Sequence, residues 1–279
     1  IEKKPLFHLL PGARAFSVGT FGCNFRCRWC QNWQISQPGS LDLDSYLGHP
    51  LPPEEIVATA QRERCAVIAY TYNEPTVFFE YTYDTARLAH AQGLKNVYVS
   101  NGFMTQEVLE LLAPYLDGIN IDLKGFSESM YEEYAGARLA PIKRNIRWLA
   151  QETDVVVEVT TLVIPDLNDS DDELRAMATW LAEVDPALPW HVTAFYPNHL
   201  MRNRPPTPPS TLLRAYKIGK EAGLQFVYVG NILDDTRSNT YCPACETRLI
   251  ERHGYRTRVS WAEPGLCPQC GTQIPGCWT

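Results

Sequence analysis

The stretch that decides the fold and chemistry of this chain is Gly22-Cys23-Asn24-Phe25-Arg26-Cys27-Arg28-Trp29-Cys30. Its three cysteines are spaced C-x3-C-x2-C and follow a short β-branched and aromatic run, residues 15–20. Three thiolates this close in sequence can converge on one inorganic centre. A closed iron–sulfur cube normally takes four cysteine ligands, so three leave one iron open for chemistry. The loop therefore predicts a redox enzyme.

The bulk composition is that of an ordinary globular protein. The chain has 279 residues, 45% hydrophobic and 20% charged, which is enough for one large domain and a small appendage. A formal net charge of −7 disfavours nucleic acid as the main partner. The sequence has no run of the roughly 18 apolar residues that a membrane-spanning helix needs. It starts at Ile1 without a charged-then-apolar leader, and we expect that N-terminal sequence has been removed or left out.

The nine cysteines indicate whether the protein works in an oxidising or a reducing compartment. Their odd number, and their grouping as C-x3-C-x2-C and two C-x2-C pairs, do not resemble a disulfide framework. Metal or cluster binding in a reducing compartment is the better interpretation, so we expect a cytoplasmic protein. Of the two cysteines outside these groups, Cys65 precedes a predicted strand and fits a small core position, and Cys277 fits a free thiol.

Apolar runs and helical patterns alternate along most of the chain. Helix starts are indicated by Pro52 and Pro53, by Thr105, and by the capping-box pair Ser170 and Glu173. The apolar runs are nearly continuous, as in a parallel sheet buried on both faces. This order predicts a β/α barrel or part of one, with a doubly wound sheet as the alternative. The predicted strands cover residues 15–20, 66–72, 96–100, 118–123, 155–164, 190–195 and 226–229.

The character of the sequence changes at Ser238. Two knuckles follow, Cys242-Pro243-Ala244-Cys245 and Cys267-Pro268-Gln269-Cys270, separated by 21 residues. Four thiolates at this spacing match a tetrahedral structural zinc ribbon, with ligation of an auxiliary iron–sulfur cluster as the alternative. We therefore predict a large domain over residues 1–237 and a four-cysteine, zinc-ribbon-like module over residues 238–279.

Polar residues follow the predicted strands at their carboxyl ends, where parallel α/β folds place their active sites. Simpler interpretations exist for several of them. Asn101 could only mark a turn with Gly102, and Glu74 could be a carboxylate that starts a helix. The alternating pair Asp122 and Lys124 could be a structural ion pair. We expect one rim, shared with the cysteine loop, to carry Asn73, Glu74, Ser100, Asn101, Asp122, Lys124, Thr160, Thr161 and Asn231.

The cysteine motif resembles that of the radical S-adenosylmethionine (SAM) superfamily. In that family three thiolates hold a [4Fe-4S] cluster whose open iron is chelated by the amino and carboxylate groups of SAM. The resemblance implies that Cys23, Cys27 and Cys30 are the cluster ligands and the centre of catalysis. It also implies a partial (β/α)6-type TIM barrel.

A narrower resemblance is to the activating-enzyme branch, which includes the pyruvate formate-lyase activase. Still more closely, the chain resembles the radical SAM enzymes of the AmmeMemoRadiSam system. The motifs that carry this likeness are spread over essentially the whole chain. They are Lys3-Lys4-Pro5-Leu6-Phe7-His8, Trp29-Cys30-Gln31-Asn32-Trp33, Thr71-Tyr72-Asn73-Glu74-Pro75, Asp122-Leu123-Lys124-Gly125-Phe126 and Tyr228-Val229-Gly230-Asn231.

The resemblance also assigns cofactor contacts around SAM. It implies that Trp29 lies against the adenine. Asn73 and Glu74 stand in the place of the superfamily's Gly-Gly-Glu-Pro element, which meets the amino group of SAM, although both glycines are absent here.

Further contacts are implied for the later strands. Ser100 and Asn101 would lie near the ribose or the methionine carboxylate. Asp122 and Lys124 would face the pocket for SAM and substrate, with Lys124 as a further catalytic candidate. Asn231 would approach the adenine side.

Together the resemblance implies reductive cleavage of SAM to methionine and a 5′-deoxyadenosyl radical. That radical would abstract hydrogen from an unidentified substrate, with a protein glycine, as in glycyl-radical activases, as one candidate. Expected partners are an electron donor such as flavodoxin or ferredoxin, and Memo-like and AMMECR-like proteins of the system. The alternative function is a zinc-only binding or scaffold module without redox chemistry.

Overall fold

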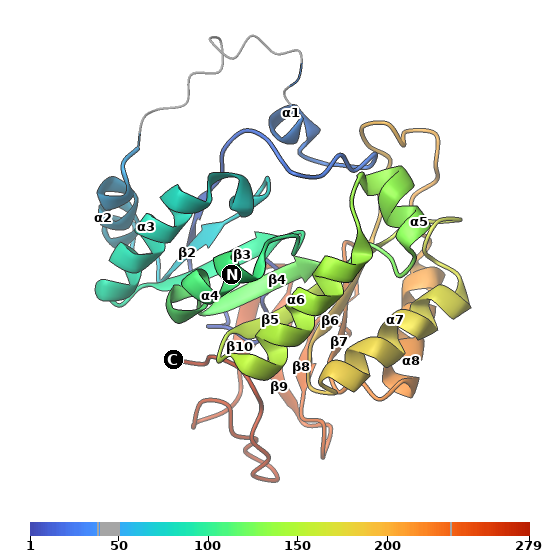
Figure 1. The fold of residues 1–279 in the computed structure, drawn as a ribbon. Coiled ribbons are helices and arrows are strands. Elements are labelled where there is room, and N and C mark those ends of the chain that lie inside the picture. Colours follow the sequence, from blue (N-terminus) through green and yellow to red (C-terminus); the bar gives the residue numbers. More distant parts are fainter. Residues whose placement is uncertain (38, 40–50, 235) are drawn as a thin grey trace.

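The computed structural model describes residues 1–37, 39, 51–234 and 236–279. Its main element is a parallel sheet whose seven strands follow one another in sequence order, from β1 to β7. Figure 1 shows the long helices on the outside of this curved sheet. The strands are β1 (Ala15–Val18), β2 (Val67–Tyr70), β3 (Lys95–Ser100), β4 (Gly118–Asp122), β5 (Val156–Val163), β6 (Trp190–Ala194) and β7 (Val227–Gly230).

The strand order excludes the doubly wound alternative. A doubly wound sheet reverses its order at a switch point, whereas here every strand pairs with the next one along the chain. Among the described residues β1 and β7 do not pair with each other, so the barrel is open. The fold is therefore the expected partial barrel, with seven strands in its sheet. No helix in the described part of the chain is long and apolar enough to cross a membrane.

The helices begin where the local sequence predicts. The Thr105 hydroxyl accepts a hydrogen bond from the Val108 N–H at 3.4 Å, and the Ser170 hydroxyl accepts one from Glu173 N–H at 3.2 Å. Prolines occupy the first turns of two others. The α-helices are α1 (Trp33–Ser36), α2 (Pro53–Arg62), α3 (Phe79–Ala91), α4 (Gln106–Leu112), α5 (Glu128–Met130), α6 (Leu139–Glu152), α7 (Asp171–Val184) and α8 (Pro209–Glu221).

The inner face of the sheet is covered by an N-terminal segment, residues 1–13. Leu6 and Leu9 are fully buried against residues of β2 and β3. The side-chain amide of Asn120 in β4 donates to the Pro5 carbonyl at 2.8 Å. A Cβ atom at Gly118 would lie 2.7 Å from Leu9 Cδ1, so β4 begins with a glycine that admits the segment. The segment therefore fills the barrel at the amino ends of the strands.

A second, antiparallel sheet follows the barrel in the C-terminal region. It consists of β8 (Thr240–Tyr241), β9 (Arg248–His253) and β10 (Arg256–Val259). In Figure 1 this region lies at the opposite end of the barrel from α1. Arg252 donates to the Phe7 carbonyl at 2.8 Å, and the Cys277 N–H donates to the His8 carbonyl at 2.8 Å. The C-terminal region and the N-terminal segment therefore close the same end of the barrel.

A chain of buried polar groups joins these parts. Glu158 accepts from the His8 N–H at 2.7 Å and lies 2.5 Å from His191 Nε2. The His8 Nε2 atom is 2.8 Å from the Tyr228 hydroxyl, which is 2.9 Å from the Thr240 hydroxyl. Burial lowers the pKa of His8 to about 4. Burial alone would raise the pKa of Glu158, but the hydrogen bond and charge of His191 outweigh it and lower that pKa.

We expect His8 to make stability fall in mild acid. Its folded pKa of about 4 lies below the unfolded value of about 6.5, so between these pH values the unfolded chain binds a proton that the folded chain excludes. The unfolding free energy should therefore fall as the pH is lowered through this window, by about 3 kcal/mol over its full width. Urea unfolding of wild type and His8→Gln at pH 7, 6, 5 and 4.5 measures the slope.

The His8→Gln variant is expected to be less stable at neutral pH, because it loses bonds to Tyr228 and Pro275, but to show a shallower pH dependence. The exposed His90 supplies the matched control, and His90→Gln should retain the wild-type slope. An unchanged slope in His8→Gln would show that another group controls acid stability.

Candidate cofactor and metal sites

The cysteine loop follows β1 and is held by backbone hydrogen bonds from distant segments. The Gly22 N–H donates to the Ile35 carbonyl at 2.7 Å, and the Arg26 N–H donates to the Ala135 carbonyl at 2.8 Å. The Leu200 N–H donates to the Arg28 carbonyl at 2.9 Å. These bonds fix the loop at the carboxyl ends of the strands, at the end of the barrel away from the C-terminal sheet (Figure 1).

The three thiols of this loop form a donor set separate from the C-terminal cysteines. Cys27 is buried, and Cys23 and Cys30 are half-buried. Among the described residues, the only group of three or more Cys, His, Asp or Glu side chains that could hold one metal ion is elsewhere, in the C-terminal region. The loop offers three thiols, one fewer than a closed iron–sulfur cube or a four-cysteine zinc site takes. This donor set therefore fits a [4Fe-4S] cluster with one open iron.

The charge environment of the loop also suits a positively charged centre. Burial raises the pKa of the Cys27 thiol to about 12, and burial raises the pKa of Cys23 as well. The nearby Lys124 ammonium acts in the opposite direction on both thiols. Thiolates at these positions therefore need the positive charge of bound metal in order to form at neutral pH.

Asn73 connects the end of β2 to the entrance of the cysteine loop. Its Oδ1 atom accepts from the Thr20 N–H at 3.0 Å, and its Nδ2 atom donates to the Gly22 carbonyl at 2.8 Å. The side chain is buried. Asn73 therefore holds both sides of the turn that leads into the first cysteine.

Glu74 connects the ends of β2 and β3. It is 2% exposed, and its carboxylate accepts from the Ser100 hydroxyl at 2.9 Å and from the Asn101 N–H at 2.7 Å. It also accepts from the Thr76 N–H at 3.1 Å, at the start of the 3-10 helix Pro75–Phe78, as expected of a helix-start carboxylate. Burial raises the pKa of Glu74. Its oxygen atoms are satisfied within the protein, so Glu74 positions the rim.

Tyr72 adopts a backbone conformation that usually requires glycine. Its φ is +77°, in the left-handed region, at the position where the superfamily element has its first glycine. The Tyr72 carbonyl accepts from the Asn32 side chain at 2.8 Å, which joins it to the cysteine loop. The missing glycine is thus replaced by a strained tyrosine without loss of the turn.

Asn101 brings the end of β3 to the cysteine loop. Its Nδ2 atom donates to Asn24 Oδ1 at 2.7 Å and lies 3.9 Å from Cys23 Sγ. The sequence arguments did not single out Asn24. Its position directly after Cys23 is the sequence feature that could have marked Asn24 as a site residue. Gly102, which follows, has a φ of +74°, in the left-handed region.

Asp122 and Lys124 form an ion pair, the simpler interpretation of their alternation, with 2.8 Å between Lys124 Nζ and Asp122 Oδ2. Burial alone would lower the pKa of Lys124, but Asp122 and Cys27 outweigh it and raise that pKa, so the ammonium stays charged. The Tyr131 hydroxyl accepts from the Lys124 N–H at 2.8 Å, and Asn168 donates to the Lys124 carbonyl at 2.7 Å. These bonds fix the cation beside the cysteine loop.

Trp29 and Asn231 are placed differently from this group. The Trp29 side chain is 4% exposed and packs in the main hydrophobic core. Asn231 follows β7, and its side chain donates to the Ala194 carbonyl at 3.1 Å. The Tyr196 hydroxyl donates to the Asn231 carbonyl at 2.8 Å. Asn231 therefore links the carboxyl ends of β6 and β7.

The four C-terminal cysteines form a compact set of ligands. Their sulfur atoms all lie within 4.8 Å of one another, and the pairs Cys242–Cys270 and Cys245–Cys267 are each 3.6 Å apart. Each knuckle has the same backbone turn, in which Glu246 donates to Cys242 and Gly271 donates to Cys267. This set can hold one tetrahedral metal ion.

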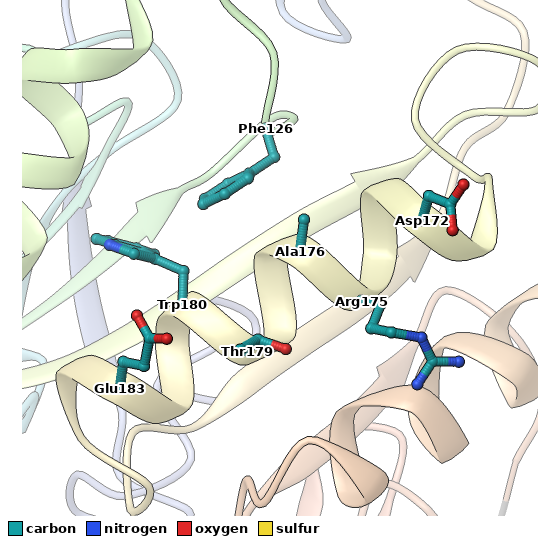
Figure 2. A pocket seen from close by; sticks show the side chains of 7 residues that line it. All are labelled: Phe126, Asp172, Arg175, Ala176, Thr179, Trp180 and Glu183. Carbon is teal, nitrogen blue, oxygen red and sulfur yellow. The ribbon is translucent and has the colours of Figure 1, made fainter.

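A surface hollow of about 460 Å³ is lined by residues of α7 and by Phe126 (Figure 2), and no cysteine is among its lining residues. The Lys143 ammonium is 4.1 Å from the centroid of the Phe126 ring and 4.9 Å from that of Trp180, so a cation already covers the aromatic wall. None of the predicted site residues lines this hollow. Its lining is Phe126, Asp172, Arg175, Ala176, Thr179, Trp180 and Glu183.

Comparison with known proteins gives a consistent picture. Residues 17–178 match the sequence model of the Radical SAM superfamily. The chain is 39% identical over 277 residues to the uncharacterized protein MJ0808 of Methanocaldococcus jannaschii, covering 98% of this chain and 81% of that protein. It is 25% identical over 191 residues to the putative glycyl-radical enzyme activating enzyme MJ1632 of the same organism, covering 67% of this chain and 70% of that protein.

A solved structure shares the fold. Streptococcus suis SuiB superposes with a TM-score of 0.60 at 12% sequence identity, covering 82% of this chain and 51% of that chain. This chain thus spans about half the length of SuiB.

We expect Cys242→Ala to remove one metal equivalent per chain and to lower the melting temperature by roughly 10 °C, equivalent to about 3 kcal/mol. The reason is that the remaining three thiolates lose the tetrahedral site that joins the two knuckles. Elemental analysis for zinc and iron measures the metal content, and calorimetry measures the melting temperature. Cys277→Ala, outside the set, should change neither. Full metal content in Cys242→Ala would refute the site.

Proposed function

Because this chain belongs to the radical SAM superfamily, we propose that it is an enzyme that cleaves SAM reductively to methionine and a 5′-deoxyadenosyl radical, which takes hydrogen from a substrate. The cluster and SAM supply the electron transfer and the radical. The protein supplies binding, orientation and shielding. The observation that carries the proposal is the loop of three thiols after β1, with the Lys124 cation acting on two of them.

Each rim residue has a proposed task. Cys23, Cys27 and Cys30 hold the cluster. Lys124 balances the negative charge of the thiolates, and Asp122 keeps that ammonium in place. These five residues would form the wall that faces the reacting groups.

The remaining rim residues would position SAM. Glu74 orients Ser100 and Asn101, which we propose lie near the ribose or the methionine carboxylate. Asn73 shapes the turn that receives the amino group. The side chain of Trp29 supports the loop from within the core, so its contact with adenine would be through the backbone. Asn231 is proposed to approach the adenine side.

The substrate and partners belong to the finer part of this proposal. A relative with 25% identity is named as a putative glycyl-radical enzyme activating enzyme, which supports a protein glycine as a candidate target. An electron donor such as flavodoxin or ferredoxin would reduce the cluster. Memo-like and AMMECR-like proteins are proposed as further partners. The zinc-only alternative is disfavoured, because only the C-terminal set among the described residues has single-ion spacing.

The Cys27→Ala variant tests the assignment of the cluster. After anaerobic reconstitution, wild type should hold about four irons and four sulfides in the loop and release 5′-deoxyadenosine from SAM when reduced. The variant should lose both, because the cube loses a ligand. Cys65→Ala, at a buried cysteine outside the loop, should retain both. Retained SAM cleavage in Cys27→Ala, or zinc alone in wild type, would contradict the proposal.

A further inference from the structure

The two C-terminal knuckles share more than their paired cysteines. In each, the first cysteine donates its N–H to the carbonyl of a threonine five residues later, at 2.9 Å in one knuckle and 3.0 Å in the other. The residue before each threonine has a left-handed φ, +60° at Glu246 and +74° at Gly271. Both knuckles therefore have the pattern Cys-Pro-x-Cys-x-Thr, as Cys242-Pro243-Ala244-Cys245-Glu246-Thr247 and Cys267-Pro268-Gln269-Cys270-Gly271-Thr272.

This turn places a threonine hydroxyl against the second sulfur of each knuckle. Cys245 Sγ lies 3.3 Å from Thr247 Oγ1, and Cys270 Sγ lies 3.2 Å from Thr272 Oγ1. A thiolate that binds a metal carries no proton, so in the metal-bound site the sulfur can only accept and the hydroxyl must donate. Each threonine is therefore in position to give one hydrogen bond to one ligand.

The threonines serve the two ligands that lie nearest to solvent. Cys242 and Cys267 are buried in an apolar cluster that includes Phe226 and Tyr228 of the barrel. In contrast, the second cysteine of the first knuckle is half-buried and that of the second knuckle is exposed. The inner half of the site is thus shielded by the barrel, whereas the outer half depends on partners within its own knuckle.

The distances between the sulfurs fit one zinc ion. A Zn–S bond of about 2.3 Å places the corners of a regular tetrahedron about 3.8 Å apart. The pairs Cys242–Cys270 and Cys245–Cys267 are each 3.6 Å apart, close to that value. A four-iron cluster would bind each thiolate to a different iron and spread the sulfurs further apart.

Four thiolates carry more negative charge than one divalent ion neutralises. A hydrogen bond to a charged acceptor is roughly twice as strong as one between neutral groups, so donors to the sulfurs stabilise the loaded site. A hydroxyl held by the turn is already oriented, whereas a water molecule would have to be ordered there. Losing such a partner of a metal ligand typically lowers metal affinity by about 10–100-fold.

We propose that Thr247 and Thr272 are positioning residues of the C-terminal metal site, and that their hydroxyls determine how tightly it holds zinc. Each donates to the outer thiolate of its own knuckle, Cys245 or Cys270. The threonines make no bond to the ion, and the four cysteines remain its ligands. This site is separate from the chemistry of SAM, so the inference does not depend on the proposed function.

Zinc affinity, measured on the anaerobically reconstituted holoprotein by competition with a chelator of known affinity, tests this inference. Thr247→Val and Thr272→Val replace a hydroxyl by a methyl group of similar size, and each should weaken zinc binding about tenfold. The corresponding serine variants keep the hydroxyl and should stay within about threefold of wild type. Cys242→Ala, which lacks a ligand, supplies the blank.

Cobalt(II) in place of zinc gives a readout that a packing role would not change. In both valine variants the thiolate-to-cobalt charge-transfer band should move to longer wavelength, because a thiolate without a donor gives up an electron more easily. In the serine variants the band should stay at the wild-type position.

Thr257→Val is the matched control, because Thr257 lies in β10 of the same region and outside both knuckles. It should leave the zinc affinity and the cobalt band unchanged. Wild-type affinity and an unshifted band in both valine variants would overturn the inference. Equal losses of affinity in the valine and serine variants, or in Thr257→Val, would also overturn it, because the hydroxyls at the knuckles would then not be the cause.

Discussion

An open, curved sheet has an inner face that must be kept from water, and the rest of this molecule depends on how that face is covered. The outer face is covered by helices, as in other parallel sheets. The inner face is covered at one end by residues 1–13, with Leu6 and Leu9 fully buried. At the other end it carries polar side chains instead. The inner face of the barrel therefore has two parts. The floor, at the amino ends of the strands, is structural, and the rim, at their carboxyl ends, carries the candidate site.

Hydrogen bonds, rather than apolar packing, set the shape of that rim. Glu74 satisfies donors from β3 and from its own helix, while Asn73 fixes the entry to the cysteine loop. Both side chains are buried, and a buried polar network with every member bonded has little freedom to rearrange. The rim is thus preorganised before any ligand arrives, which is what catalysis by positioning requires.

Much of this arrangement could be predicted from sequence, because its signals are local. Every predicted strand is present, with its ends within about two residues of the predicted ones. The helix caps predicted at Thr105 and Ser170 are also present. The cysteine spacings separated the loop from the C-terminal set. The N-terminal segment was missed as a structural element, because it has no helix or strand and its turn residues resemble those of a surface loop. Tyr72 could not be predicted either, since a positive φ at tyrosine is imposed by its surroundings.

The floor of the barrel joins residues that are far apart in the sequence and are therefore synthesised at different times. The carbonyl of Cys277 accepts from the Leu10 N–H, and that of Pro275 lies 2.8 Å from His8 Nδ1. Residues 6–10 are synthesised long before residues 275–277, so these contacts cannot form until the later partners have left the ribosomal exit tunnel. Contacts of such high sequence separation form slowly. Until residues 275–277 have been synthesised, Leu6 and Leu9 would lie in an incomplete barrel, and the nascent chain would expose this apolar end to chaperones.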